Sequence, residues 1–473
     1  MENKLLVMPI PNSVKQDTHV KLQVRSLGDE EWTDVPLFAV RVDMHQVRQA
    51  AAAMFDFSGS VEVRIQSREP WVYKAVVRPV SKGIVPVCEG REVRFTLHEP
   101  VDLMIEINGE RFRCLHLFAR PLMTLPEGDD VVHYRASMHS PSTAPARPPR
   151  REDGKPCTVV FHAGLHFVHD YQYRPDSNTR IVLAPGAVVI GMFILDHVEN
   201  VSIEGHGVLL QECFHRFAGT GGVRLSYCRN VSVQGVTFIN PPQFTVLLGS
   251  SEHVRIEGIR TFSCEGWSDG IAMMGSHHVH VSDCFLRNSD DCLSLYGQRG
   301  EYIGDAHDIR IERCTLWADV AHPFNMGTHG AYDKDGSILE RIILRDIDIL
   351  EHHEPQPGYL GCMAINAGDM NTVRDVLFED IRVEHIENGK LFDIQVTYNP
   401  KYNPVPGRKI ENVTLRNISC DCIPPVDSVI QGYDEEHGVT GVKLENVTVC
   451  GNAPRVVVGE FTREIDLGGA VPC

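Results

Sequence analysis

The stretch Asn230-Val231-Ser232-Val233-Gln234-Gly235 is one copy of a short pattern that decides the fold of this chain. Apolar residues alternate with polar ones, as in a β-strand that buries one face. Further copies begin at or near Asn200, His253, His278, Asp308, Arg341, Asp375, Asn412 and Gly441. They recur every 23 to 37 residues, which predicts the stacked coils of a parallel β-solenoid with loops of varying length. A leucine-rich repeat is the competing solenoid, but its regular leucine and asparagine positions are missing here.

Residues 1–140 carry a different pattern, in which short alternating runs are separated by turn residues. The Asn108-Gly109 step between two such runs is the strongest short signal for a β-hairpin. We therefore expect an N-terminal antiparallel β-sandwich that covers one end of the solenoid or walls its cleft. Residues 141–155 are rich in proline and small polar residues and are predicted to be a linker, which leaves 156–473 for the solenoid domain.

The composition is that of an acidic globular protein. The formal charge of −18 comes from 63 acidic residues against 45 lysines and arginines, which disfavours nucleic acid and anionic membranes as partners. The N-terminus has no secretory signal pattern, and no run of about 18 apolar residues occurs, so we expect a cytoplasmic protein that does not span a membrane. In that compartment the 14 cysteines are expected to be reduced, with Cys264, Cys284 and Cys314 stacked inward.

Two acidic segments lie about one coil apart within the repeats. Trp267-Ser268-Asp269-Gly270 is followed by Asn288-Ser289-Asp290-Asp291, so that Asp269 precedes Asp290 by 21 residues. In a stack of coils, residues separated by one coil lie above one another, and three carboxylates are expected to converge. Hydrolysis of a glycosidic bond needs one protonated and one ionised carboxyl group, and crowding raises the pKa of one of them. Asp290 and Asp291 can share a cleft only if the chain bends there, because adjacent strand residues face opposite sides.

These segments resemble the polygalacturonase-like glycoside hydrolases of family 28, a clan of right-handed parallel β-helices with dextranase-type relatives. In that clan, Asn-Thr-Asp is followed by Asp-Asp and then by a Gly-His-Gly segment, and this chain has Ala321-His322-Pro323 at the third place. The resemblance implies that Asp290 is the general acid and that Asp269 and Asp291 orient and deprotonate water. It also implies that His322 supports the protonation of the acid, and that the reaction inverts anomeric configuration.

One departure from the family bears on the substrate. The clan's Arg-Ile-Lys motif, which holds the uronate carboxylate, is replaced here by the uncharged stretch Gly361–Gly368 followed by Asp369. A pocket without those cations gains nothing from a substrate carboxylate, so we expect a neutral sugar, held by groups such as Asn366 and Asp369. A galacturonate-specific exo-polygalacturonase stays open as an alternative, with a cation supplied from another loop by Arg287, Arg299 or Arg374.

Further sugar-binding candidates flank the acidic segments. Trp267 offers a flat face to a sugar ring, Tyr296 and His329 follow the motif segments, and Asn325 lies within the histidine segment. No sequence pattern indicates a metal or another cofactor. His162, His166 and His169 lie in a predicted strand where their spacing does not align ligands, and His277, His278 and His280 are interpreted as solvated polar edges.

Two other classes of function are open. A β-helical polysaccharide lyase or uronate epimerase needs a basic side chain and a cation, which the triple aspartate with a histidine fits poorly. A carbohydrate-binding protein that has lost catalysis would keep the pocket without turnover.

Overall fold

The computed structural model describes residues 3–69, 71–128, 130–136, 140–149, 157–216 and 221–472. Nearly all the regular structure in this part of the chain is β-strand, and its one helix is the short 3-10 helix η1 (Val80–Lys82). None of these residues belongs to a helix with the length and apolar character needed to cross a membrane. The prediction of an all-β fold is confirmed.

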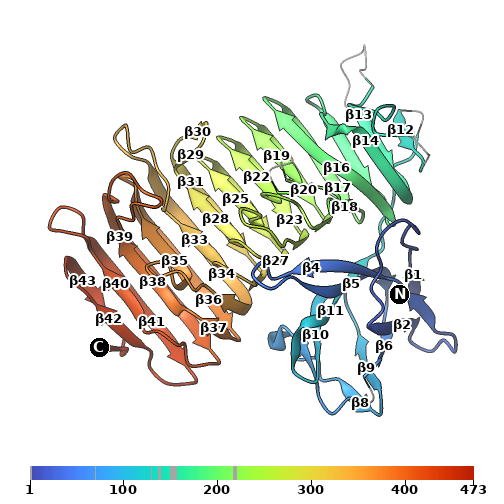
Figure 1. Cartoon of the computed structure of the whole chain (residues 1–473), viewed down its shortest axis with the longest axis horizontal. Helices are drawn as coiled ribbons and strands as arrows, with labels where there is room; N and C mark the ends of the chain where they lie inside the picture. Colours follow the sequence, from blue (N-terminus) through green and yellow to red (C-terminus); the bar gives the residue numbers. More distant parts are fainter. Residues whose placement is uncertain are drawn as a thin grey trace.

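A right-handed parallel β-helix forms the larger part of the molecule, as predicted (Figure 1). Each complete coil contributes strands to three parallel sheets, which we name the template, covered and cleft sheets. The template sheet contains β12 (Val131–Tyr134), β13 (Cys157–Phe161), β15 (Thr179–Leu183), β17 (Glu199–Gly205), β20 (Arg229–Gln234), β23 (Glu252–Glu257), β26 (His277–Ser282), β31 (Ala306–Glu312), β34 (Ile338–His353), β36 (Thr372–Val383), β39 (Lys409–Cys420), β41 (Val439–Val449) and β43 (Thr462–Asp466).

The other two sheets are built from the shorter strands of each coil. The covered sheet contains the first half of β16 (Ala187–Asp196), then β18 (Val208–Leu210), β21 (Thr237–Ile239), β24 (Arg260–Phe262), β27 (Phe285–Asn288), β32 (Thr315–Ala318) and the second halves of β34, β36, β39 and β41. The cleft sheet contains the second half of β16, then β19 (Val223–Ser226), β22 (Val246–Gly249), β25 (Ile271–Met274), β28 (Leu293–Tyr296), β33 (Phe324–Met326), β35 (Gly361–Ala367), β38 (Lys390–Val396), β40 (Ser428–Gln431), β42 (Arg455–Val458) and β44 (Val471–Pro472).

The apolar positions of the repeat stack on one another inside the solenoid. Val231 pairs with Val254, which pairs with Val279, and all three are buried in one continuous core. Cys284 and Cys314 are buried free thiols of this core, as expected, whereas Cys264 follows β24 and lies outside it. Alternation along each strand therefore fixes both the coil and its register.

The first residue of each repeat copy adopts a left-handed backbone. The φ angles are 57° at Asn200, 52° at Asn230 and 54° at Asn412, a conformation that asparagine tolerates better than most residues. Asparagines of neighbouring coils also bond to each other, since Asn230 Nδ2 donates to Asn200 Oδ1 at 2.6 Å. The corner geometry explains why polar residues open the repeat.

The N-terminal domain is a two-sheet sandwich. One sheet is antiparallel and contains β3 (Thr33–Val35), β2 (Val20–Ser26), β6 (Val61–Ser67), β9 (Glu92–Leu97) and β8 (Val87–Glu89). The other contains β1 (Lys4–Leu6), β5 (Arg48–Ser58), β11 (Glu110–Pro121), β10 (Val101–Ile107) and β7 (Ala75–Arg78), with β4 (Leu37–Val42) paired to β5. The predicted hairpin is present at Asn108-Gly109, but β5 and β11 pair in parallel, so this sheet is mixed.

The sandwich packs against the side of the solenoid rather than covering its end (Figure 1). Phe38 and Phe118 share an apolar cluster with Phe285 and Trp317 of the covered sheet. Arg78 crosses the interface and donates to Glu351 at 2.8 Å. The sandwich was expected at an end of the solenoid or at the cleft. It lies elsewhere because its apolar face packs against the apolar outer face of the covered sheet.

The solenoid begins earlier than residue 156. Val131–Tyr134 forms β12 and pairs in parallel with β13. Of the predicted linker, residues 141–149 are described, and they lie against β14 (Gly164–Tyr173), where the backbone N–H of His169 donates to Pro145 at 3.1 Å. The rest of that prediction, 150–155, lies outside the described residues.

Candidate active site

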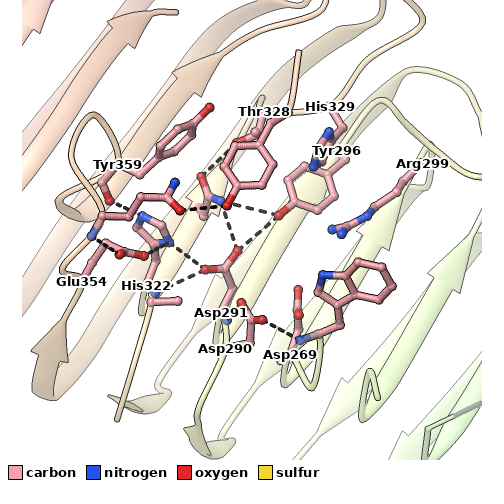
Figure 2. Close-up of a pocket in the computed structure, with 15 residues that line it drawn as sticks. Asp269, Asp290, Asp291, Tyr296, Arg299, His322, Thr328, His329, Glu354 and Tyr359 are labelled. Atoms are coloured by element: carbon pink, nitrogen blue, oxygen red, sulfur yellow. Dashed lines mark hydrogen bonds and ion pairs between the residues drawn. The ribbon is translucent and has the colours of Figure 1, made fainter. Parts of the chain in front are cut away.

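A polar pocket with an internal volume of about 120 Å³ lies over the cleft sheet, where the chain turns into β25, β28 and β33 (Figure 2). It is lined by Trp267, Asp269, Asp290, Asp291, Tyr296, Arg299, Ala321, His322, Asn325, Thr328, His329, Glu354, Gln356, Tyr359 and Tyr402. Eight of the ten predicted site residues are among them.

The three aspartates reach the pocket from the turns of two successive coils. Asp269 precedes β25, and Asp290 and Asp291 lie in the turn between β27 and β28. The N–H of Gly270 donates to the Asp291 carbonyl at 2.9 Å, which joins the two coils at this point. The turn supplies the bend that lets both neighbours face the pocket.

Asp291 is held as a carboxylate by donors on both of its oxygens. His322 Nδ1 lies 2.7 Å from Oδ1, while Asn325 Nδ2 and the Tyr296 hydroxyl lie 3.0 and 3.2 Å from Oδ2. Burial acts to raise the pKa of Asp291, but the charge and hydrogen bonds of His322 outweigh it and lower this pKa below the ordinary value. Asp291 is therefore the ionised member of the cluster.

Asp290 is more exposed than its neighbour and has a different environment. Its Oδ2 accepts a hydrogen bond from the Trp267 backbone N–H at 2.6 Å. Burial and the negative charge of Asp291 raise the pKa of Asp290 to about 6. Trp267 has a φ of 65°, which is rare for an aromatic residue and directs this N–H at the carboxylate.

Asp269 is the most enclosed of the three carboxyl groups. It is 2% exposed, and Ser294 Oγ donates to its Oδ2 at 2.6 Å. Burial, followed by the charges of Asp290 and Asp291, raises the pKa of Asp269 well above the ordinary value. The cluster thus combines two carboxyl groups of raised pKa with one of lowered pKa.

His322 supports a different aspartate from the one expected. The imidazole contacts Asp291, not the proposed acid Asp290, and its Nε2 lies 2.6 Å from the Tyr359 carbonyl. Burial acts to lower the pKa of His322, but the Asp291 carboxylate overcomes this and raises it to about 9. Glu354, whose Oε2 lies 3.9 Å from Nδ1, adds negative potential beside the ring. Ala321, the residue before this histidine, has a left-handed backbone with a φ of 66°.

The predicted sugar-binding side chains surround the aspartates. Trp267 is 45% exposed at the rim, and His329 packs edge-on against Tyr296 with ring centroids 4.9 Å apart. Burial and the nearby Arg299 lower the pKa of His329 to about 3, so it stays neutral. Asn325 donates to Asp291 and is turned toward the catalytic cluster.

Asn366 and Asp369 do not line the pocket. Asn366 is completely buried beneath other groups, and Asp369 points to Gly330, whose N–H lies 3.4 Å from its Oδ2. Nearby, the buried Asn403 donates to the Thr328 carbonyl. The prediction that these two residues contact the sugar directly is not supported by their positions.

The three arginines considered as replacements for the missing cations lie in different places. Arg287 is fully buried and paired with Asp319 under the sandwich, and Arg374 pairs with Glu340 on the template sheet. Arg299 alone lines the pocket, where its guanidinium lies 5.7 Å from the Trp267 ring and 5.5 Å from the Tyr296 ring. Among the described residues no carboxylate lies within ion-pair distance of Arg299.

Sequence reasoning missed one wall of the pocket. Glu354, Gln356 and Tyr359 come from the loop between β34 and β35, and Tyr402 comes from the loop after β38. The only sequence feature that indicates these loops is the greater length of the later repeats, which leaves room for loops over one face. Which side chains those loops aim at the pocket does not follow from the repeat pattern.

Three clustered aspartates beside an imidazolium, in a pocket on a parallel β-helix, define a protein suited to acid–base hydrolysis of a glycosidic bond. Residues 221–464, more than half of the chain, match the model of glycosyl hydrolases family 28, and the chain belongs to this family. The match contains the three aspartates and His322, whereas the sandwich lies outside it.

Several curated relatives are similar over part of the chain. An exopolygalacturonase (clone GBGE184) of Arabidopsis thaliana is 22% identical over 229 residues, covering 46% of this chain and 51% of the relative. A polygalacturonase of Prunus persica is 22% identical over 325 residues, covering 62% and 77%. A polygalacturonase of Chamaecyparis obtusa is 28% identical over 75 residues, 15% of each chain. The match thus covers about half of the length of the Arabidopsis relative and much less of the Chamaecyparis relative.

Among solved structures, Dex49A from Penicillium minioluteum has a similar fold. Its TM-score is 0.60 at 14% identity, with 94% of this chain and 91% of that chain covered. The coverage means that the shared fold includes the sandwich as well as the solenoid.

Proposed function

We propose that this chain is an inverting glycoside hydrolase in which Asp290 is the general acid and Asp291 the general base. The observation that carries the proposal is the different surroundings of two adjacent aspartates in one pocket: His322 Nδ1 lies 2.7 Å from Asp291 Oδ1, whereas Asp290 accepts hydrogen bonds from the backbone N–H groups of Trp267 and Asp291. In agreement with this, the pKa is raised to about 6 at Asp290 and lowered at Asp291. Pairs of carboxyl groups whose environments separate their pKa values supply the acid and the base of such reactions.

Each group has a defined proton task. Asp290 donates its proton to the glycosidic oxygen as the bond to the anomeric carbon breaks. Asp291 accepts a proton from the water that attacks that carbon, and His322 keeps Asp291 ionised between turnovers. Asp269, with its raised pKa and its bond to Ser294, positions this water rather than competing for its proton.

The inverting outcome is proposed from the likeness of the three aspartates and His322 to those of family 28, all of which lie within the matched residues 221–464. The hydrogen bonds on both oxygens of Asp291 favour its ionised form, which is the state that a general base needs.

We propose a neutral sugar as the substrate. The stretch Gly361–Gly368, which corresponds to the family's Arg-Ile-Lys motif, contains no charged residue, and its strand β35 pairs with β33 beside Asn325. No cation therefore rises from β35 toward the pocket, while Trp267 presents an apolar rim suited to the C–H face of a pyranose.

Arg299 favours a second candidate, an acidic sugar. Its guanidinium lines the pocket without an ion-pair partner among the described residues, and a carboxylate on the substrate would form a charge-assisted pair with it. The neutral-sugar proposal instead assigns Arg299 to stacking on Trp267 and Tyr296, where it also offsets the charge of the aspartates.

The test compares wild type with Arg299→Gln on matched neutral and uronate oligosaccharides, with the anomer of the first product followed by NMR. A neutral-sugar enzyme releases inverted product from the neutral substrate, and the substitution changes its activity by less than about 10-fold. Uronate cleavage that Arg299→Gln reduces by about 10- to 100-fold, the loss of one charge-assisted bond, would select the second candidate.

The same assay separates the other classes of function. A lyase would form unsaturated products that absorb in the ultraviolet and would lose activity with a chelator. A binding protein would retain oligosaccharide but release no reducing ends. Retention of configuration would contradict the proposed roles of Asp290 and Asp291.

A further inference from the structure

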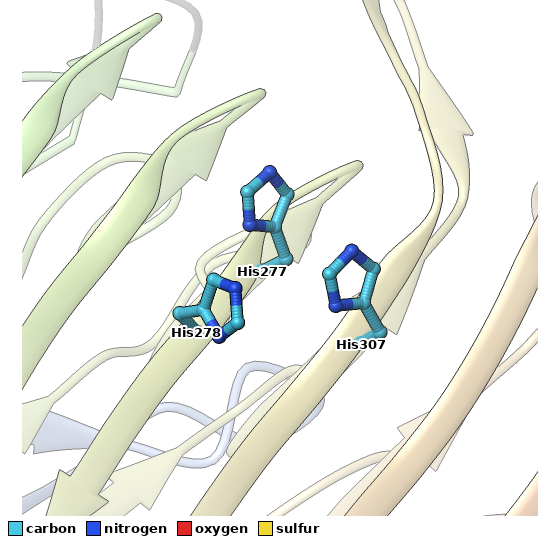
Figure 3. A group of neighbouring side chains, drawn as sticks. All are labelled: His277, His278 and His307. Atoms are coloured by element: carbon cyan, nitrogen blue, oxygen red, sulfur yellow. The ribbon is translucent and has the colours of Figure 1, made fainter.

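Three histidines gather on the template sheet, away from the residues that line the pocket (Figure 3). His277 and His278 open β26, and His307 lies near the start of β31 in the next coil. Each of the three offers a ring nitrogen within 4.8 Å of the others. From the sequence, His277 and His278 are expected at solvated edges, because their proximity to His307 depends on the register of the coils.

Coil stacking determines this grouping. The pairing of Val279 with Ile309 sets the strand register so that His277 faces His307 across neighbouring coils. Their rings are stacked, with centroids 4.6 Å apart and planes 5° from parallel, and the ring of His278 stands edge-on to both. The cluster therefore spans two coils.

The hydrogen bonds leave nitrogens available for a ligand. His307 Nδ1 lies 2.7 Å from Asp308 Oδ2, so its Nε2 presents a lone pair. The buried Nδ1 of His277 has no hydrogen-bond partner among the described residues, and Oε2 of Glu252 lies 3.9 Å from it.

We propose that His277, His278 and His307 form a binding site for a divalent transition metal such as Zn²⁺. Imidazole is a preferred ligand of zinc, copper and nickel, whereas calcium and magnesium require oxygen. Water completes the coordination.

The side chains have the freedom to close on an ion. Zinc–nitrogen bonds are about 2.0–2.1 Å long, so the three nitrogens must approach one another by rotation of their rings. The side chains of His277, His278 and His307 are 32%, 43% and 25% exposed, which permits that rotation. Asp308 accepts from the ring nitrogen that would not bind the metal, the second-shell arrangement common around metal-bound histidines. A bound ion would join the two coils.

The test is calorimetric titration of the untagged full chain with ZnCl₂. We expect one saturable site per chain, and at least a 10-fold loss of affinity in His278→Ala and in His307→Ala. Because a ligand that binds only the folded state stabilises it, zinc should also raise the melting temperature of wild type but not of the triple alanine variant. Calcium should give no saturable binding.

His280→Ala is the matched control, since His280 lies on the same strand but pairs with Glu312 instead. It should bind zinc as tightly as wild type. With Cu²⁺ as the probe, paramagnetic resonance should show hyperfine coupling to several nitrogens, and each alanine variant should lose one. No saturable zinc binding, or equal losses in His280→Ala and His278→Ala, would overturn the site.

Discussion

The covered and cleft sheets are two faces of one solenoid with opposite outer surfaces. Both turn apolar residues into the same core, such as Leu286 in β27 and Leu295 in β28. Outside, Phe285 of the covered sheet packs against the sandwich, whereas Ser294 of the cleft sheet donates to Asp269 in the pocket. The inward-facing residues therefore form the core of each coil. The outward-facing residues determine whether a sheet packs against the sandwich or lines the pocket.

The two faces meet at the catalytic turn. Arg287, the last outward residue of β27 before Asn288, is buried against the sandwich, and Asp290 follows three residues later in the pocket. The sandwich also touches this turn directly, because the N–H of Met44 donates to Ser289 Oγ at 3.2 Å. The covered face thus supports the turn that carries the proposed acid and base.

Replacing the proposed acid, Asp290, should have the largest effect, and this effect should be on activity rather than on stability. Asp290→Asn keeps the shape of the side chain but cannot donate a proton from a carboxyl group, and we expect kcat to fall by about 10²- to 10⁴-fold. The melting temperature should stay near that of wild type, because Asp290 is partly exposed and relieves repulsion with Asp291 when neutralised.

Asp283→Asn, an exposed change near the start of the same coil, is the matched control and should retain activity. Steady-state kinetics on a substrate that wild type cleaves, with circular dichroism to establish folding, checks the comparison. Turnover by Asp290→Asn within 10-fold of wild type would remove this residue from its role.

Breaking the buried ion pair between Arg287 and Asp319 on the covered face should lower the free energy of unfolding rather than the activity. Asp319 and Arg287 are 2.8 Å apart and fully buried, so Asp319→Asn leaves a guanidinium uncompensated at a cost of about 3–5 kcal/mol. Chemical denaturation measures the loss. The same substitution at Asp283, whose exposed pair with Arg313 is also 2.8 Å long, should cost less than about 1 kcal/mol. Equal losses at the two sites would show that burial does not distinguish these faces.

The charge of His322 should appear in the pH profile. Asp291 must be ionised and Asp290 protonated, so activity falls as pH drops through the lowered pKa of Asp291 and as pH rises through about 6 at Asp290. His322→Gln removes the cation that lowers the pKa of Asp291, and the acidic limb of kcat/KM should move to higher pH.

His329→Gln is the control for that shift. His329 lines the same pocket, but with a pKa of about 3 it carries no charge near neutral pH, so its loss should leave the acidic limb in place. An unmoved limb in His322→Gln would indicate that another group ionises on that side of the profile.

The repeat made most of the solenoid predictable from sequence. Stacking converts a separation of one coil into spatial proximity, so the convergence of Asp269 with Asp290 could be predicted without knowing a loop conformation. The hairpin at Asn108 was equally local.

The features that the sequence did not predict depend on where side chains point rather than on their spacing along the chain. The contact of His322 with Asp291 depends on where the imidazole points, and Tyr359 and Tyr402 come from loops that do not repeat. Asn366 is completely buried, and the strand alternation that places it on β35 does not show how deeply it is packed. Similarly, the docking of the sandwich depends on outward residues whose apolar character is visible but whose partner is not.

The smallest expected effect distinguishes the ring of Trp267 from its backbone. Trp267→Asn removes the indole but keeps a residue that tolerates the φ of 65° and retains the N–H bonded to Asp290. If the ring contributes only sugar contact, about 0.5–1.5 kcal/mol, KM should rise by roughly 2- to 10-fold with kcat nearly unchanged. A fall in kcat at unchanged KM would mean instead that the indole, by shielding Asp290 from water, helps to set its pKa. Comparing the basic limb of the pH profile in the variant with that of wild type would then locate the effect on the acid itself.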